Sequence, residues 1–373
     1  MKNPKWDKKS IELIKAYLTQ GYNYGDIAKK MNSTYNAVEH IIRRNNLQSE
    51  LIIQKEDRGL KPKEVLAKSL EIGKYLYENY KKIKLIDPKP AKNICKREEQ
   101  SILDLSDLHI GMINEVFDSD IGKNIITYNG EIFKEELEVL IKSIKEIHKI
   151  LSNSYKLKTL TINLMGDIVT NDRIFDEQVF EIEKPVGLQV WDTINYLIYT
   201  IQSLLEVYEN IKIVCVVGNH GRSLPDSYEE PVENNFEYFI YKTLEKQYEN
   251  SKRVEIVVPN SRRYIYNILK WKHLIEHGDS LRTSSPTGLE KQIKDLSINV
   301  GGFDIFHFGH FHKLKDDEIS DKVIVKQNGS WIYKDNYAFK KYKYYSIPKQ
   351  WFFGCNENRP ETWAYKLDLR KIK

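Results

Sequence analysis

The sequence has 373 residues, of which 41% are hydrophobic and 30% are charged, and this composition is typical of a soluble globular protein. No apolar run approaches the ~18 residues that a membrane span needs, and the first residues lack the apolar core of a secretory signal. The three cysteines lie far apart without a Cys-x-x-Cys pair, which argues against a disulfide framework or a cysteine-ligated zinc site. We therefore expect a cytoplasmic protein that makes no membrane contact.

The charge is distributed unevenly along the chain. Residues 1–100 carry 22 Lys and Arg against 13 Asp and Glu, a net charge of +9, whereas the remaining residues carry 36 against 40, a net charge of −4. A basic first part on a mildly acidic body suits binding of a polyanion by the N-terminal residues. The alternative is a solvated lysine-rich linker, which is the interpretation we favour for residues 81–97.

Residues 1–48 are predicted to form a small domain of three helices. Apolar residues recur at helical spacing in each segment, Gly21 stops the first helix, and Asn32-Ser33 offers an N-cap for the third. The three segments are residues 7–21, 24–31 and 34–47. Short helices joined by a short turn, with the small residue Ala28 in the second, resemble the homeodomain-like helix-turn-helix domains of phage and bacterial DNA-binding proteins.

If this domain binds DNA, its third helix enters the major groove. Arginine suits phosphate or guanine, and Asn36 suits adenine. The predicted DNA-contacting residues are Ser33, Thr34, Tyr35, Asn36, His40, Arg43 and Arg44. The alternative is a three-helix module that binds protein, but the basic charge of this part favours a surface that contacts phosphate.

Residues 49–99 are predicted to be a basic linker with one helix over residues 63–83. Residues 87–100 are rich in proline and charge, as expected of a linker or an extended lead-in. From residue 100 to 373 short apolar runs alternate with helical stretches at first and later follow one another closely. This pattern predicts an α/β domain with helices outside its sheets. Its strands are expected at residues 101–106, 158–165, 211–217, 253–258, 263–270, 271–277, 303–309, 322–327 and 363–369, and its helices at 130–151 and 186–209.

Five of these predicted strands end in polar clusters. The clusters supply Asp107 and His109, Asp167, Asn219 and His220, His277, and His310 and His312. Because ligands collect beyond the carboxyl ends of strands in α/β sheets, the five clusters can meet in one pocket. A two-metal site needs a bridging carboxylate with nitrogen and oxygen ligands on each side, and these side chains suit Mn²⁺, Fe²⁺ or Zn²⁺. Taken alone, each cluster could equally be a surface turn.

The ordered series DLH, GD, GNH, HG and GHFH over residues 101 to about 330 resembles the calcineurin-like metallophosphoesterase superfamily. The resemblance implies a four-layer α/β/β/α sandwich and two divalent ions, with manganese expected. One ion would be held by Asp107, His109 and His312, the other by Asn219, His277 and His310, and Asp167 would bridge them. The resemblance also implies that His220 binds the phosphate and protonates the leaving oxygen, and that Arg222 holds a phosphate oxygen.

Two departures from the family pattern stand out. Gly221 occupies the position after GNH where many members carry an acidic residue that orients the histidine, and Asp226, Glu229, Glu230 or Asp279 are alternative sources of that carboxylate. The interval between Asp107 and Asp167 is also wide, so that residues 111–130 are expected to form an extra loop beside the metal site. A role in shaping the substrate site and an idle surface insertion are equally open for this loop.

The fold alone does not choose among the monoesters, diesters and nucleic acids that such enzymes hydrolyse. A helix-turn-helix is joined to this body, and residues 359–369 follow a basic and aromatic stretch over residues 334–354. This order of domains and this ending resemble phage and prophage members of the superfamily. We therefore expect a DNA nuclease or phosphodiesterase. One alternative is a hydrolase of small phosphoesters tethered by its N-terminal domain. Another is a DNA-binding regulator with a vestigial phosphoesterase body.

Overall fold

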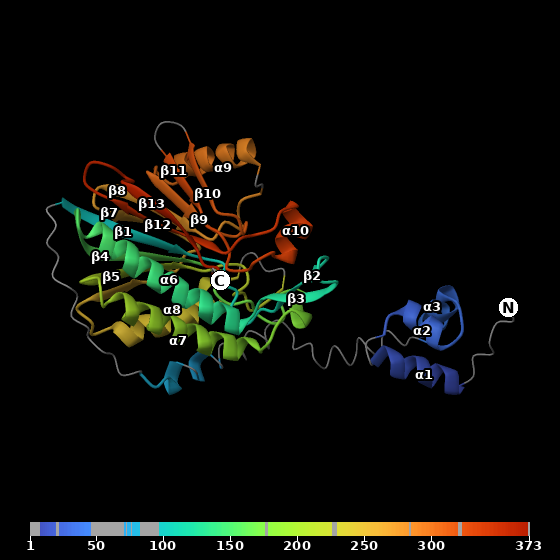
Figure 1. Ribbon diagram of the computed structural model, residues 1–373. Coiled ribbons are helices and arrows are strands. Elements are labelled where there is room, and N and C mark those ends of the chain that lie inside the picture. The colour runs from blue at the N-terminus through green and yellow to red at the C-terminus, as the bar shows by residue number, and fades with distance from the viewer. Residues whose placement is uncertain are drawn as a thin grey trace. The chain divides into compact units, whose positions relative to one another are not determined.

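The computed structural model forms two compact units, Met1–Ala67 and Lys68–Lys373 (Figure 1). It describes residues 8–19, 22–45, 71, 73–75, 77–82, 97–175, 178–225, 230–282, 285–319 and 323–371. The division lies within the segment predicted to be a linker. Of the helix predicted over residues 63–83, residues 71, 73–75 and 77–79 are helical and residues 80–82 are not, while residues 63–70, 72, 76 and 83 lie outside the described part.

Three short helices make up the described part of the first unit. Their bounds are α1 (Lys8–Thr19), α2 (Tyr24–Lys30) and α3 (Tyr35–Arg44). The N-cap of α3 is Thr34, whose hydroxyl accepts from the amide of Ala37, so the prediction of Asn32-Ser33 as the cap was wrong. The helices enclose a small apolar core made of Ile14, Ile27, Ala28, Val38, Ile41 and Ile42. This packing is that of a three-helix domain, and its assignment as a helix-turn-helix stays a prediction.

The second unit contains a six-stranded sheet in the order β13-β12-β1-β4-β5-β6. Strands β1, β4, β5 and β6 are parallel, and β12 and β13 extend the sheet in antiparallel fashion beside β1. Because parallel strands share a direction, the carboxyl ends of β1, β4 and β5 meet at one edge. The strands are β1 (Arg97–Leu105), β4 (Tyr155–Met165), β5 (Asn210–Val216), β6 (Val254–Val257), β12 (Lys349–Cys355) and β13 (Trp363–Asp368).

A five-stranded sheet in the order β10-β11-β9-β8-β7 lies against the first one. Its central strands β8, β9 and β11 are parallel, and the two outer strands run antiparallel to their neighbours. The strands are β7 (Arg263–Ile268), β8 (Trp271–Glu276), β9 (Ile305–Phe308), β10 (Lys315–Ile319) and β11 (Val323–Gln327).

Alternating side chains bury both faces of each sheet, as period-two strands require. Ile102 of β1 contributes to the core between the two sheets, whereas its neighbour Leu103 packs toward the helices. In β8, Ile275 joins the same inter-sheet core and Leu274 packs on the other side, with α9. The result is a sandwich of two sheets covered by helices on its outer faces.

Helices α6, α7 and α8 cover the six-stranded sheet, and α9 covers the five-stranded sheet (Figure 1). A further helix, α10, follows β11 and leads back to β12. Their bounds are α6 (Gly130–Leu151), α7 (Val186–Leu204), α8 (Phe236–Tyr248), α9 (Pro286–Asn299) and α10 (Asn336–Tyr342), with single 3₁₀ turns at Gln178–Phe180 and Val232–Asn234. Among the described helices, we find none whose length and apolar content would allow it to cross a bilayer.

Residues 111–130, predicted to be a loop, instead contain a two-stranded hairpin of β2 (Asn114–Asp118) and β3 (Lys123–Tyr128). The prediction failed because alternation between apolar and polar residues in this stretch is weak. The hairpin is tied to the start of α10, where the Asn336 amide donates to the Glu115 carbonyl over 2.7 Å. The insertion is therefore anchored to the segment that follows β11.

Candidate functional site

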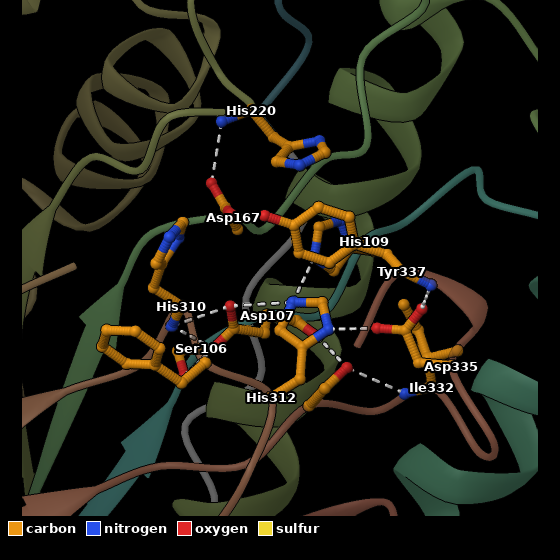
Figure 2. Close-up of polar contacts among 12 residues, drawn as sticks. Ser106, Asp107, His109, Asp167, His220, His310, His312, Ile332, Asp335 and Tyr337 are labelled. Atoms are coloured by element: carbon orange, nitrogen blue, oxygen red, sulfur yellow. Dashed lines mark hydrogen bonds and ion pairs between the residues drawn. The ribbon is translucent and has the colours of Figure 1, made fainter. Parts of the chain in front are cut away.

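The polar clusters at the strand ends converge in space. Asp107 and His109 follow β1, Asp167 follows β4, Asn219 and His220 follow β5, His277 follows β8, and His310 and His312 follow β9. Most of these side chains are buried, and His220 and His310 are half-buried. Figure 2 shows His312 beside Asp107 and His109, and the ring of His310 beside Asp167. Residues up to 205 positions apart in the sequence thus share one site.

Within this site the potential ligand atoms form three overlapping groups, each with all its atoms within 4.8 Å of one another. One group is Asp107, His109 and His312, a second is Asp167, His277 and His310, and the third is His109, Asp167 and His220. The Asn219 side-chain oxygen lies 3.1 Å from Nε2 of His277, which adds it to the second group. Asp167 therefore lies where the two predicted ligand sets meet.

The backbone of this site is unusual. Five of its residues have a left-handed backbone, with φ of 53° at Asp107, 48° at His109, 51° at Asp167, 68° at His310 and 54° at His312. Residues other than glycine seldom adopt this conformation, although aspartate and histidine do so more often than most others. Such residues gather at functional sites, where the surrounding structure holds them in place.

One backbone amide and one hydroxyl hold the Asp107 carboxylate. The amide of His310 lies 3.1 Å from both of its oxygens, and the Ser106 hydroxyl donates to Oδ2 over 2.6 Å. Gly309 makes this approach possible, since a Cβ atom there would lie 2.3 Å from Oδ2 of Asp107. The ends of β1 and β9 are thereby joined through the site itself.

Two histidines have one ring nitrogen fixed by a hydrogen bond. Nδ1 of His277 lies 2.8 Å from the Met165 carbonyl and donates to it, so Nε2 faces Asp167 at 2.9 Å. Nδ1 of His312 is hydrogen-bonded to the Asp335 carboxylate, so Nε2 faces His109 and Asp107 (Figure 2). Partners of this kind set the tautomer and orientation of metal-binding histidines. Asp335 was not predicted, because it lies in a loop far from the recognised motifs.

The residues present fit a pair of divalent ions. Nε2 of His109 and Nε2 of His312 approach to 3.1 Å, and Nδ1 of buried His109 has no hydrogen-bond partner within the described part of the chain. Two acceptor nitrogens so close need a proton or a cation between them. The set of carboxylate, imidazole and amide donors, without a thiolate, suits Mn²⁺, Fe²⁺ or Zn²⁺.

The acid-base properties of the site follow from burial and mutual charge. Burial acts to raise the pKa of Asp167, but the His277 and His220 imidazoles hold that pKa well below its usual range. Burial acts to lower the pKa of His312, yet the Asp335 and Asp107 carboxylates raise it to about 10. Burial lowers the pKa of His109. The lowered pKa favours the neutral imidazole, which is the form that binds metals.

His220 and Arg222 lie beside these groups, on the loop after β5. Nδ1 of His220 donates to the Thr170 carbonyl over 2.8 Å, which leaves Nε2 as the nitrogen that can exchange a proton with a ligand. Its backbone amide donates to Oδ1 of Asp167 over 2.8 Å. The Arg222 guanidinium is buried, and its Nε donates to the Asn219 carbonyl over 2.8 Å.

The carboxylate expected to orient His220 is replaced by the Thr170 carbonyl. Of the candidates, Asp226 and Glu229 lie outside the described residues, and Glu230 accepts from the backbone amide and hydroxyl of Ser223. A side chain at Gly221 would force Asn235 or Glu237 to shift, since a Cβ atom there would lie 2.1 Å from Oδ1 of Asn235. The remaining candidate, Asp279, lines a cleft that does not include His220.

Other residues that the sequence did not indicate hold the loops of the site together. The Asn171 amide donates to the carbonyls of His220 and Arg222, at 2.7 and 2.8 Å. The buried Glu237 carboxylate accepts from the amides of Ile168 and Gly218, at 2.6 and 2.7 Å. The start of α8 is thus tied to the ends of β4 and β5, which carry Asp167 and Asn219.

Two histidines near the site, His273 and His307, belong to the core. Nδ1 of His273 lies 2.9 Å from Nε2 of His307, and Nδ1 of His307 lies 2.9 Å from Oδ2 of Asp104. All three side chains are buried between the sheets. They are structural neighbours of the site and do not reach its ligand groups.

In the N-terminal unit, α3 carries most of the predicted DNA-contacting residues on its exposed side. Tyr35, Asn36, His40, Arg43 and Arg44 are exposed, whereas Ser33 is half-buried and the Thr34 hydroxyl caps the helix. Arg43 forms an ion pair with Glu39 at 2.9 Å. The helix therefore offers a basic outer face with polar side chains.

No family model matches the sequence, and no curated protein matches it. Solved structures give low similarity. They include wild-type Vps29 from Entamoeba histolytica in complex with Zn²⁺, at 11% identity and a TM-score of 0.31, covering 72% of this chain and 99% of that one. A conserved protein of Streptococcus pneumoniae TIGR4, described as a predicted phosphoesterase, has 10% identity and a TM-score of 0.30, covering 73% and 99%. A hypothetical protein of Pyrococcus horikoshii OT3 has 12% identity and a TM-score of 0.36, covering 73% and 89%. Values this low carry no argument about the present chain.

Proposed function

We propose that the chain is a two-metal-dependent phosphodiesterase of the calcineurin-like metallophosphoesterase superfamily, of the phage or prophage type, and that its substrate is DNA. The observation that carries this proposal is the convergence of five strand-end clusters on one buried site, with Asp167 shared between two ligand groups. Paired ion sites of this composition serve in-line displacement at phosphorus. The ordered motifs of the sequence support the same assignment.

The ligand groups suggest how two ions would be held. Asp107, His109 and His312 would bind one ion, and Asn219, His277 and His310 would bind the other, with Asp167 between them. When bound, such ions lower the pKa of water toward ~7 and offset the charge that develops on phosphoryl oxygens. We expect manganese, although the same donors suit Fe²⁺ and Zn²⁺.

The chain's own groups would position the phosphate and supply a proton. With Nδ1 of His220 held by the Thr170 carbonyl, its Nε2 is the atom that would protonate the leaving oxygen. Arg222, buried beside Asn219, would hold a phosphate oxygen through its guanidinium. The Asn171 side-chain amide would hold both residues in position by donating to their backbone carbonyls.

DNA is favoured among phosphoesters because of the N-terminal unit. Its helix α3 exposes Arg43, Arg44, His40 and Asn36, the residue types that contact phosphates and base edges. A domain that binds duplex DNA would raise the local concentration of substrate near the phosphoesterase body. Salt-sensitive DNA binding by this unit would support the assignment.

The test is cleavage of end-labelled single- and double-stranded DNA by the full-length protein with added Mn²⁺, beside the Asp167→Asn variant. We expect metal-dependent cleavage that is lost on chelation and in the variant, and a product ladder that separates exonuclease from endonuclease action. Cleavage that persists in Asp167→Asn would indicate a contaminating nuclease. Turnover of bis(p-nitrophenyl) phosphate without cleavage of DNA would overturn the DNA assignment and favour a small phosphoester.

A further inference from the structure

Two clefts of different chemistry adjoin the candidate metal site. The first, of about 380 Å³, includes Asn219 and His310 on its wall and is called the cationic cleft. The second, of about 410 Å³, includes His109, His220 and His312 and is called the His220 cleft. Phe175 and Tyr337 line both. A larger depression of about 950 Å³ near α9 contains none of the candidate ligands. A ligand centred on the metal site can therefore extend in two directions.

The cationic cleft is built to hold anions. Arg222, Arg282 and Lys341 line it, against the single carboxylate of Asp279. The buried Arg222 is fixed through the Asn219 carbonyl, and Nζ of Lys341 donates to the Tyr337 hydroxyl over 2.5 Å, while Arg282 is exposed at the rim. Cationic side chains held beside a phosphodiesterase site in this way can bind the phosphates next to the one that is cleaved.

The His220 cleft has an apolar and aromatic wall. Met112 and Ile332 line it together with the rings of Phe175 and Tyr337. Besides its three histidines, its polar lining is Thr170, Gln178, Glu181, Asp335 and Lys340. The Phe175 side chain is 46% exposed, and its ring centre lies 5.1 Å from that of His220. An apolar pocket with a few polar groups, in the range of about 300–1,000 Å³, is typical of small organic ligands. A nucleoside, with a flat base that can stack on Phe175, fits this description.

The position of His220 indicates which part of the substrate lies in which cleft. It lines the His220 cleft and is absent from the lining of the cationic cleft. On the proposed function, Nε2 of His220 gives its proton to the leaving oxygen as the bond from phosphorus to that oxygen breaks and a new bond to the oxygen of water forms. The leaving nucleoside then lies in the His220 cleft, and the product phosphate stays on the side of the cationic cleft.

We propose that the protein binds single-stranded nucleic acid across the two clefts, with an unpaired base stacked on Phe175 in the His220 cleft and neighbouring phosphates on Arg222, Arg282 and Lys341. A base within a duplex is stacked on its neighbours and cannot enter such a pocket unless it is extruded. Single-strand recognition at this site is thus expected whatever the N-terminal unit binds. This inference rests on the proposed function for its direction, but its binding component can be tested without cleavage.

The test uses the full-length Asp167→Asn protein with Mn²⁺ and measures fluorescence anisotropy of a short labelled oligothymidylate, an abasic strand of equal length and a duplex. Adding Phe175→Ala should weaken binding of the oligothymidylate about tenfold or more and leave the abasic strand and the duplex unchanged. Phe175→Leu, which keeps an apolar side chain but removes the ring, should show the same pattern. Phe117→Ala, at an exposed aromatic residue of β2, is the control and should change nothing.

Arg282→Ala should weaken binding of both the normal and the abasic strand, because a phosphate contact is lost. The slope of the logarithm of the binding constant against the logarithm of the salt concentration should fall in magnitude by about one. Arg359→Ala, at an exposed arginine outside both clefts, is its control. Equal losses for abasic and normal strands in Phe175→Ala, or no loss, would overturn the proposed base site even if the wild type cleaves DNA. Failure of the wild type to cleave DNA, together with the base-dependent loss, would overturn the nuclease function and leave the binding site standing.

Discussion

Asp335 and His312 are joined by a hydrogen bond from Nδ1 of the imidazole to the carboxylate, and both side chains are buried. The bond turns the other nitrogen of His312 toward Asp107 and His109. It also links the loop after β9 to the residue that caps α10, since Asp335 accepts from the amide of Tyr337 over 2.8 Å. The orientation of a candidate ligand and the start of a helix therefore depend on one carboxylate.

The Asp335→Asn substitution should weaken binding of the ion held by Asp107, His109 and His312. Loss of a partner that orients a ligating histidine lowers metal affinity by about 10- to 100-fold. Calorimetric titration of the metal-free protein with Mn²⁺ measures the effect. Asp317→Asn, at a half-exposed residue of β10 paired with Lys315, is the matched control. Unchanged affinity in Asp335→Asn would contradict the role given to this residue.

The His220→Ala substitution should abolish cleavage while leaving Mn²⁺ affinity largely intact. His220 is expected to transfer a proton, and removal of such a group costs about 10²- to 10⁴-fold in rate. The measurement pairs single-turnover cleavage of labelled DNA with a metal titration of the same preparation. Loss of metal binding in this variant would show that His220 is a ligand, as its presence in a group with His109 and Asp167 allows.

The Gly221→Ala substitution should destabilise the protein by about 1–3 kcal/mol. The added Cβ atom would lie 2.1 Å from Oδ1 of Asn235 and 2.7 Å from Cγ of Glu237, at the point where the start of α8 meets the strand ends. Gly187→Ala is the matched control, because a Cβ atom at Gly187 meets nothing within 4 Å. Denaturant unfolding compares the two variants. Equal stabilities would mean that α8 can shift without cost.

The Glu136→Gln substitution should remove a pH dependence of stability. Burial and the charge of Asp368 raise the pKa of Glu136 from 4.5 to about 9, so the folded protein keeps a proton there that the unfolded chain has lost. The stabilisation is complete below pH 4.5 and declines as pH rises toward 9, by about 1.4 kcal/mol per unit. Between pH 6 and pH 8 the free energy of unfolding of the wild type should therefore fall relative to that of the variant. Glu135→Gln, at an exposed residue, should run parallel to the wild type.

Replacing Arg43 or Arg44 by alanine should weaken the salt dependence of duplex DNA binding. Each substitution should reduce the slope of the logarithm of the binding constant against the logarithm of the salt concentration by about one, with little effect on cleavage of small phosphodiesters. Both side chains are exposed on α3. Arg370→Ala, at an exposed residue near the C-terminal end of the described chain, provides the control for a loss of charge. Equal slopes in all variants would indicate that α3 does not contact DNA.

Much of the sandwich could be predicted because its strands carry long apolar runs and end in recognisable polar motifs. Helix α6 has the predicted bounds, and its apolar residues repeat at helical spacing without interruption. Strand β12 was missed because its residues lie in a basic and aromatic stretch, yet it lies directly beside β1 in the sheet. Strand β10 was missed because the sequence KDDEI is charged, as an edge strand can be.

The candidate ligands could be proposed from the sequence because each motif places carboxylate, imidazole or amide side chains directly after a predicted strand. Their supporting residues could not. Asp335, Asn171 and Glu237 act through contacts with residues distant in the sequence, and no local pattern distinguishes them from ordinary loop or helix residues. The Thr170 carbonyl orients His220 through its backbone, so no side chain marks it in the sequence.

The left-handed backbone at His109 and His310 has a consequence for protein engineering. Glycine and asparagine adopt such a conformation at lower cost than histidine, so substitution at these positions relieves a local penalty. A library selected only for resistance to heat would therefore accumulate replacements at the very residues proposed to hold the ions. Thermostable variants of this protein should be screened for metal content before they are screened for anything else.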